Sequence, residues 1–205
     1  MRPALPRVHA VTDERIARRA DLDDVAAALA AGAPGIALHA RGHTLTGLEH
    51  YRLAVRLRPT LSVPVRLFVN DRLDVALATG ADGVQLGTGS LGVAEARRLG
   101  PAWLVGRSVH TVADALAARA AGADYLLAGP VFPTRTHPDA APLGLAGLGA
   151  IVAVGLPVIA IGGVTVERIE TLRAAGAWGA AVIRALWDAA DPRAAARAME
   201  DAWQR

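Results

Sequence analysis

Short apolar runs alternate with alanine-rich segments of helical period along the whole chain. Eight of these runs are rich in Val, Ile and Leu, as strands buried on both faces are. They span 8–12, 35–40, 65–70, 83–87, 103–108, 125–131, 157–163 and 178–184. Because their starts lie about 18 to 32 residues apart, each interval has room for one strand and one helix.

The segments between these strands carry start and stop signals for helices. Helices are expected at 21–32, 71–80, 111–122 and 165–176. They open on Asp or Thr, which can cap a first turn, and they end on Gly, the usual residue after a helix. Eight repeated strand–helix units predict a single (β/α)8 (TIM) barrel over residues 1–205. A doubly wound open sheet is the alternative, and the regularity of the eight units favours closure.

Composition narrows the class of protein further. The chain has 205 residues, of which 53% are hydrophobic and 20% charged, which fits one globular domain. No apolar run reaches the roughly 20 residues that span a bilayer, and the N-terminus becomes charged too early for a secretory signal. We therefore expect a cytoplasmic protein without a membrane partner. The alanine-rich helices are compatible with a homodimer, although nothing in the sequence specifies an interface.

Two residue types are missing from the sequence. The absence of Cys excludes disulfides and thiolate nucleophiles, and all 22 basic residues are Arg. Without Lys, neither a Schiff-base mechanism nor a P-loop phosphate site is possible. The net charge is only +3 and the arginines are scattered among acids, so we expect no nucleic-acid partner.

In a (β/α)8 barrel the active site lies at the carboxyl ends of the strands, and several polar residues follow the predicted strands there. These candidate ligand-binding residues are His39, Arg41, Asn70, Ser108, Thr134, Arg135, Thr136, Gly162, Gly163 and Arg184. Gly162 and Gly163 follow the seventh predicted strand, where backbone N–H groups can approach a phosphate; a plain turn is the alternative. The stretch 129–138 could clamp an anion through its threonines and Arg135, or be a proline-rich surface loop.

Histidines and one aspartate are the candidates for proton transfer and metal binding. His39, His110 and His137 lie at the predicted mouth, whereas His9 is expected to be structural. His43 and His50 are expected at the surface. No histidine pair has the spacing of a helical zinc site. Asp71 is the most plausible Mg²⁺ ligand, or else a cap of the following helix.

Four segments together resemble the thiamine-phosphate synthase and TenI-like family. They are FVNDRLDVALATGADGVQLG (68–87), GRSVHT (106–111), ADYLLAGPVFPTRTH (123–137) and PVIAIGGVT (157–165). The resemblance implies a (β/α)8 barrel in thiamine metabolism with a small thiazole phosphate as ligand. It places the phosphate of that ligand at Gly162, Gly163 and the backbone near Ile183 and Arg184.

In the synthase branch of this family, a pyrimidine diphosphate loses pyrophosphate and a thiazole nitrogen attacks the resulting cation. The resemblance implies Mg²⁺ and a cationic pocket for that reaction. The family's Gln-x-Arg-x-Lys pattern reads Ala37, His39 and Arg41 here, and the lysine after the Thr-x-Thr loop is His137. Arg41 keeps a positive charge, whereas Ala37 and His39 lose polar contacts.

The family's two Mg²⁺-binding aspartates fall on Asp71 and Ser90. Because Ser90 removes a negative charge from the cation site, we expect impaired handling of pyrophosphate. The synthase reaction, with Mg²⁺ at Asp71, is therefore kept as an alternative.

The segments HAVTD, QLGTGS and GRSVHT look more like the TenI branch, a thiazole tautomerase. We therefore expect aromatisation of a carboxythiazole phosphate by proton transfer, an isomerase reaction that needs no metal or cofactor. The tautomerase's histidine on the sixth strand is Pro130 here, so His137, and after it His110, are the expected acid/base groups. A barrel that binds thiazole phosphate without catalysis is a further alternative.

Overall fold

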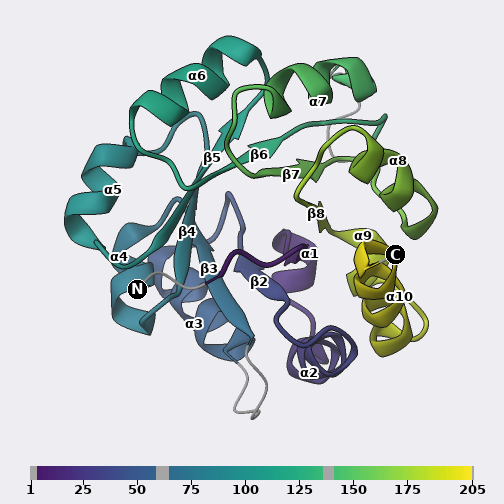
Figure 1. The fold of residues 1–205 in the computed structure, drawn as a ribbon. Coiled ribbons are helices and arrows are strands. Elements are labelled where there is room, and N and C mark those ends of the chain that lie inside the picture. The colour runs from purple at the N-terminus through teal and green to yellow at the C-terminus, as the bar shows by residue number, and fades with distance from the viewer. Residues whose placement is uncertain (1–3, 59–64, 136–140, 205) are drawn as a thin grey trace.

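The computed structural model describes residues 4–58, 65–135 and 141–204, and it shows eight parallel strands closed into a barrel (Figure 1). Each strand pairs with the next one along the chain, and β8 pairs with β1. The strands are β1 Val8–Val11, β2 Ala37–Ala40, β3 Arg66–Asn70, β4 Gly83–Leu86, β5 Leu104–Val109, β6 Tyr125–Ala128, β7 Val158–Ile161 and β8 Gly179–Val182. The predicted (β/α)8 barrel is confirmed, and the open-sheet alternative is wrong.

Helices form the outer layer around the strands (Figure 1). They are α1 Glu14–Ala17, α2 Leu22–Gly32, α3 Gly47–Leu57, α4 Leu73–Thr79, α5 Val93–Leu99, α6 Val112–Ala120, α7 Gly144–Val152, η1 Val166–Arg168, α8 Ile169–Ala174, α9 Arg184–Trp187 and α10 Pro192–Gln204. The four helices expected from sequence are all present, the last one as η1 followed by α8. Within the described ranges, no helix is long and apolar enough to cross a membrane.

The predicted capping signals are confirmed at some helix ends only. Thr111 caps α6 in a reciprocal capping box with Asp114, and Gly80 ends α4 in the left-handed region. Asp21 and Thr165 make no side-chain capping bond. Gly32 lies inside the last turn of α2, where a Cβ would be 2.2 Å from a carbonyl oxygen of α10, so its role is close helix packing.

The core has two parts. The larger part lies between the barrel and its helices, and its largest buried side chain is Trp187. The smaller part fills the barrel itself, around Phe68 and Tyr125. His9 and His39 are also buried there, and the ring of His39 stacks on Phe68 with centroids 4.9 Å apart. A polar pair therefore sits in an apolar barrel interior.

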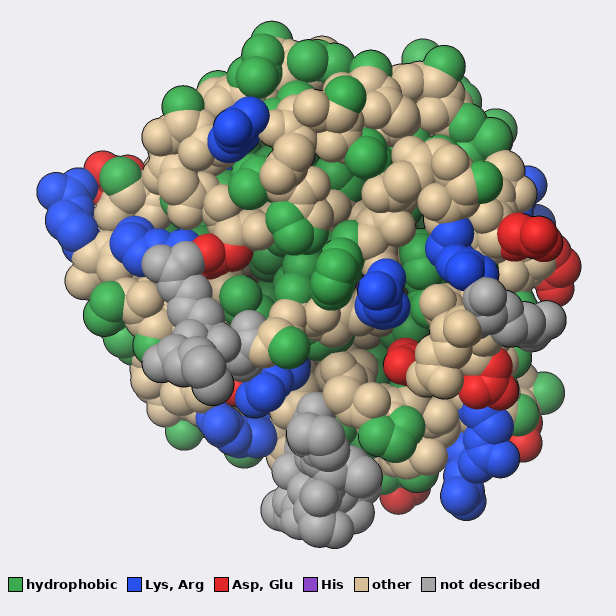
Figure 2. Space-filling model, in the orientation of Figure 1, with side chains coloured by type: hydrophobic (Ala, Val, Ile, Leu, Met, Phe, Trp, Pro, Cys, Tyr) green, Lys and Arg blue, Asp and Glu red, His purple; other side chains and the backbone are tan. Residues whose placement is uncertain are grey.

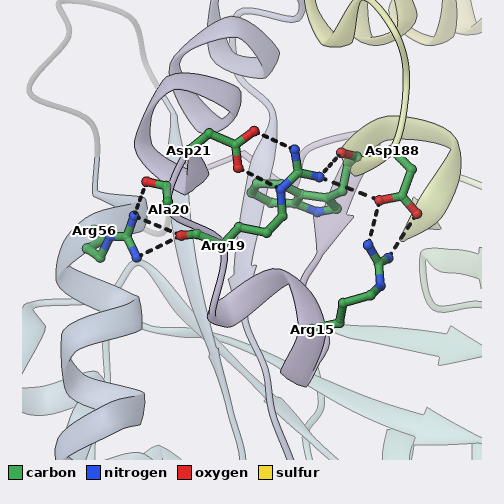
Figure 3. Close-up of polar contacts among 7 residues, drawn as sticks. Arg15, Arg19, Ala20, Asp21, Arg56 and Asp188 are labelled. Carbon is green, nitrogen blue, oxygen red and sulfur yellow. Dashed lines mark hydrogen bonds and ion pairs between the residues drawn. The ribbon is translucent and has the colours of Figure 1, made fainter.

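An ion-pair network joins the first and last units of the barrel (Figure 3). Arg15 of α1 forms a bidentate pair with Asp188 after α9, at 2.8 and 2.9 Å, and Arg19 reaches the same carboxylate at 3.5 Å. Arg19 also pairs with Asp21, and Arg56 of α3 donates to the backbone carbonyl of Arg19. These contacts link α1 and α3 to the residue that follows α9, and exposed pairs of this kind each stabilise a fold only a little.

Candidate active site

A cavity of about 810 Å³ opens at the carboxyl ends of the strands. All eight strand–helix units contribute to its lining, as expected for a (β/α)8 barrel. Its charged lining, within the described residues, is four arginines and one carboxylate: Arg41, Arg135, Arg168, Arg184 and Asp71. The cavity therefore suits an anionic ligand. Over the face drawn in Figure 2 the arginines are dispersed rather than gathered into one patch.

Gly162 and Gly163 line the cavity just after β7, with φ of +96° and +66°. A Cβ on Gly163 would lie 2.6 Å from the Pro133 carbonyl oxygen and 2.8 Å from Phe132 Cβ, so the loop after β6 packs directly on this turn. The carbonyl of Gly162 accepts from Phe132 N–H at 3.1 Å. Backbone N–H groups at a turn of this kind can donate to the oxygens of a phosphate.

Arg168, which sequence reasoning missed, joins the two loops of this phosphate-type site. Its guanidinium lies 4.4 Å from the centre of the Phe132 ring and donates to the Gly163 carbonyl oxygen. No carboxylate of the described residues forms an ion pair with it. The signal available in the sequence was its place in the first turn after the glycine pair.

The other predicted residues on this side of the barrel are brought to the same cavity. Thr134 and Arg135 line it from the loop after β6, and Ile183 and Arg184 line it at the start of α9. Thr136 and His137 lie outside the described residues. We call the wall formed by Thr134, Gly162, Gly163, Arg168 and Arg184 the donor side, since it presents N–H and hydroxyl groups.

Ser108 and His110 line the cavity from β5 and the turn after it. The Ser108 hydroxyl accepts from Gln85 Nε2 at 3.0 Å. His110 Nδ1 lies 2.6 Å from the carbonyl oxygen of Gly129, so Nδ1 carries the hydrogen and donates. Its Nε2 is therefore an acceptor when the ring is neutral.

Asp71 follows β3 and lines the cavity across the barrel mouth from β7. Its Oδ1 accepts from Gly87 N–H at 2.8 Å and from the Ser90 hydroxyl. Helix α4 begins after Arg72, and Asp71 makes no capping bond to it, so the helix-cap alternative is wrong. Among the described non-glycine residues only Asp71 has positive φ, at +63°, which costs on the order of 1 kcal/mol. The site thus holds a carboxylate at a strained backbone position.

Arg41 lines the cavity at the end of β2 and is held by its backbone. Its N–H donates to Thr12 Oγ1 at 2.9 Å, and Thr12 Oγ1 donates back to its carbonyl at 2.8 Å. Desolvation lowers the pKa of Arg41, and the carboxylates of Glu14 and Asp71 oppose that shift. The charged form is retained, since arginine is not deprotonated in proteins.

His39 is not at the mouth, contrary to the sequence interpretation. It is fully buried beneath the cavity, hydrogen-bonded to His9 and to Asn70. The inward side of β2 at this position is too deep to reach a ligand, and only Asn70 of this group lines the cavity. His50 is also buried, with its Nε2 donating to the Ala40 carbonyl at 2.9 Å, so its surface assignment was wrong. His43 is exposed, as expected.

The metal-binding potential of the cavity rests on Asp71. The described residues contain no group of three or more His, Asp or Glu side chains that could hold a metal ion. Mg²⁺ needs no such group, because it is usually bound by one or two carboxylates together with substrate phosphates. Asp71, with Oδ1 fixed by Gly87 and Ser90, fits that mode.

The fold and the cavity define a (β/α)8 barrel whose strand ends line a cavity with four arginines. Residues 8–186 match the thiamine monophosphate synthase family, and the chain belongs to that family. It is 46% identical over 198 residues to the thiamine-phosphate synthase of Methanoculleus marisnigri, covering 95% of this chain and 93% of that one. It is 39% identical over 190 residues to the thiamine-phosphate synthase of Pyrococcus abyssi, covering 92% and 90%.

Solved structures agree with this assignment. A thiamine phosphate pyrophosphorylase from Pyrococcus furiosus superimposes with a TM-score of 0.82 at 36% identity, over 97% of this chain and 95% of that one. A 3-hexulose-6-phosphate synthase superimposes with a TM-score of 0.71 at 21% identity, which shows the shared fold alone.

These relatives overturn the tautomerase interpretation and with it the isomerase assignment. The similar proteins, at 39 to 46% identity over most of the chain, are named as synthases. From the sequence, the loss of a negative charge at Ser90 was expected to impair the handling of pyrophosphate. In the structure its hydroxyl donates to Asp71 and so keeps that carboxylate in place. The change at position 90 alters the site without removing its remaining acid.

Proposed function

We propose that this protein is a thiamine-phosphate synthase, which joins hydroxymethylpyrimidine diphosphate to a thiazole phosphate and releases pyrophosphate. The cavity supports this proposal most directly. In this member of the family it is lined by four arginines and by one carboxylate, that of Asp71, whose backbone is strained. The two substrates carry several negative charges between them, which that arrangement can match.

The chemistry asks the protein mainly to stabilise a leaving group and to align two ligands. The bond from the pyrimidine methylene carbon to the diphosphate oxygen breaks, and the electron pair leaves with pyrophosphate. The thiazole nitrogen then donates its lone pair to that carbon and forms the new C–N bond. Charge builds up on the leaving oxygens, so fixed cations in a cavity that excludes water lower the barrier. Arg41, already desolvated at the end of β2, suits this role.

Mg²⁺ fits this reaction, and Asp71 is the described residue that would hold it. The ion would supply positive charge that stabilises the leaving pyrophosphate. The chain's own contribution is to hold the carboxylate still: Gly87 and Ser90 fix Oδ1. Oδ2 has no hydrogen-bond partner among the described residues and remains available.

The thiazole phosphate is assigned to the donor side. Gly162, Gly163, Ile183 and Arg184 all line the cavity. Arg168 adds a cation stacked on Phe132. Holding the thiazole by its phosphate leaves its ring nitrogen to meet the pyrimidine carbon, and such alignment accelerates a two-substrate reaction strongly.

The decisive experiment mixes the protein, both substrates and Mg²⁺, and detects thiamine phosphate as its fluorescent oxidation product. We expect product with Mg²⁺ and a large loss on addition of EDTA. The matched control is Asp71→Asn, which keeps the shape of the side chain and removes its charge. Folded protein that binds thiazole phosphate but yields no product would overturn the proposal in favour of a binding-only barrel.

A further inference from the structure

Two histidines inside the barrel connect a fixed backbone carbonyl to the wall of the cavity. His9 Nε2 lies 3.0 Å from the Pro6 carbonyl oxygen, and His9 Nδ1 lies 2.8 Å from His39 Nε2. His39 Nδ1 lies 3.1 Å from the Oδ1 position of the Asn70 amide, which lines the cavity. The three side chains are buried, His9 and His39 completely. We call the two rings the His9–His39 pair.

Only one arrangement of hydrogens satisfies this series of hydrogen bonds when both rings are neutral. Each of the three links needs one hydrogen, and two neutral imidazoles supply two. The Pro6 carbonyl can only accept, so His9 carries its hydrogen on Nε2 and accepts at Nδ1. His39 must then donate from Nε2 and accept at Nδ1. The third hydrogen has to come from the amide of Asn70.

A proton shared by the pair would be the other way to fill the third link. The surroundings oppose it, because burial lowers the pKa of His9 to about 4 and the pKa of His39 well below its ordinary value. The positive groups that would oppose a proton on His39 are Arg41 and, when protonated, His9. No carboxylate of the described residues acts on His39, and an uncompensated buried charge is strongly disfavoured.

We propose that the His9–His39 pair orients the Asn70 amide, with Nδ2–H donated to His39 and the carbonyl oxygen turned to the cavity. The two ends of an amide have the same shape, so the hydrogen-bond network decides which end faces which partner. His9 and His39 are thus positioning residues. They touch no ligand, and they determine which end of the Asn70 amide faces the cavity.

This orientation has a consequence for recognition, which rests on the proposed synthase function. The wall formed by Asn70 and Asp71, here called the acceptor side, presents oxygens only. Asn70 therefore receives a hydrogen-bond donor of the pyrimidine substrate and does not hold the diphosphate. The diphosphate oxygens are left to the arginines, which can only donate.

The first test needs no substrate and so is independent of the proposed function. Nitrogen NMR of protein labelled with ¹⁵N-histidine reads the tautomer of each ring near pH 7, with His9→Gln and His39→Gln used to assign the signals. We expect both rings neutral with the hydrogen on Nε2. A hydrogen on Nδ1 of His39, or an imidazolium in either ring, would overturn the proposal.

The second test compares two substitutions of His39 by calorimetric binding in EDTA. His39→Gln keeps one donor for His9 and one acceptor for Asn70, whereas His39→Leu keeps neither. We expect His39→Leu to weaken binding of the pyrimidine diphosphate about tenfold and of inorganic pyrophosphate less than about twofold. His39→Gln should stay within about threefold of the unmodified protein for both probes.

Equal loss of both probes in His39→Leu would mean that Asn70 donates to the anion, and would overturn the proposal. A thermal melt of each variant accompanies the titrations, so that loss of folding is separated from loss of orientation. If His39→Leu does not fold, the tautomers of the unmodified protein still decide the question.

Discussion

The donor side and the acceptor side of the cavity face each other across the barrel mouth. Both contain residues with positive φ, but for different reasons. On the donor side, Gly162 and Gly163 take positive φ, which glycine adopts freely. On the acceptor side, Asp71 takes φ of +63° against its preference. The difference follows from what each side must present. Backbone N–H groups need no side chain, whereas an acceptor for a cation needs a carboxylate even at the cost of strain.

The largest expected effect comes from the acceptor side. Asp71→Asn should lower synthase activity on the order of 10³-fold, because it removes the cavity's one described carboxylate and with it the ligand for Mg²⁺. Product formation measured across a Mg²⁺ titration checks this. Activity that stays at the level of the unmodified protein would show that the cation, if needed, is held elsewhere.

On the donor side, Gly163→Val should weaken synthase activity about 10²-fold through the KM of the thiazole phosphate. The new side chain would meet Pro133 O and Phe132 Cβ and would strain a backbone at φ of +66°, displacing the phosphate site. Gly149→Ala, where a Cβ meets no atom within 4 Å, is the matched control. An unchanged KM in Gly163→Val would move the phosphate away from this turn.

Beneath the acceptor side, the His9–His39 pair makes stability depend on pH. Burial lowers the pKa of His9 from 6.5 to about 4, so the unfolded chain binds a proton between these values and the folded chain does not. Stability must therefore fall as pH falls from 6.5 towards 4. We expect His9 to contribute a loss of about 2 kcal/mol in the free energy of unfolding between pH 7 and pH 5.

Urea unfolding at the two pH values measures this change, and His9→Gln is the control, since it should reduce the pH dependence by the contribution of His9. A slope that is equal in both proteins would show that His9 is protonated in the folded state.

The smallest expected effect comes from Arg168 on the donor side. Arg168→Ala should raise the KM of the thiazole phosphate about tenfold and change that of the pyrimidine diphosphate less, because Arg168 joins the Gly163 turn to Phe132. Arg173→Ala removes the same charge outside the cavity and should have no effect. Steady-state kinetics with each substrate varied in turn separates the two constants.

Much of the barrel could be predicted from the sequence, because strands buried on both faces and helices that end on glycine give a regular pattern of residues. All eight strands lie where the apolar runs predicted them. Less of the site could be predicted. Arg168 acts through Phe132 and Ser90 through Asp71, which are distant in the chain, and the local sequence does not predict such contacts.

Capping shows the same limit on a smaller scale. Thr111 could be identified because its partner Asp114 lies three residues away. Asp71 has the same local appearance as a cap, but closure of the barrel brings Gly87 to its carboxylate instead. A local pattern describes competing partners equally well, and only their positions in space select one.

The sequence by itself determined the barrel, the family and the types of group at the strand ends, because strand periodicity and residue chemistry are local properties. The tertiary structure alone decided which of these groups reach the cavity. His39 lies in β2 and Arg41 directly follows that strand, yet His39 is buried among rings and Arg41 lines the cavity. That outcome depends on how deep each side chain lies along the barrel axis. The register of all eight strands sets this depth, so no single segment of the sequence determines it.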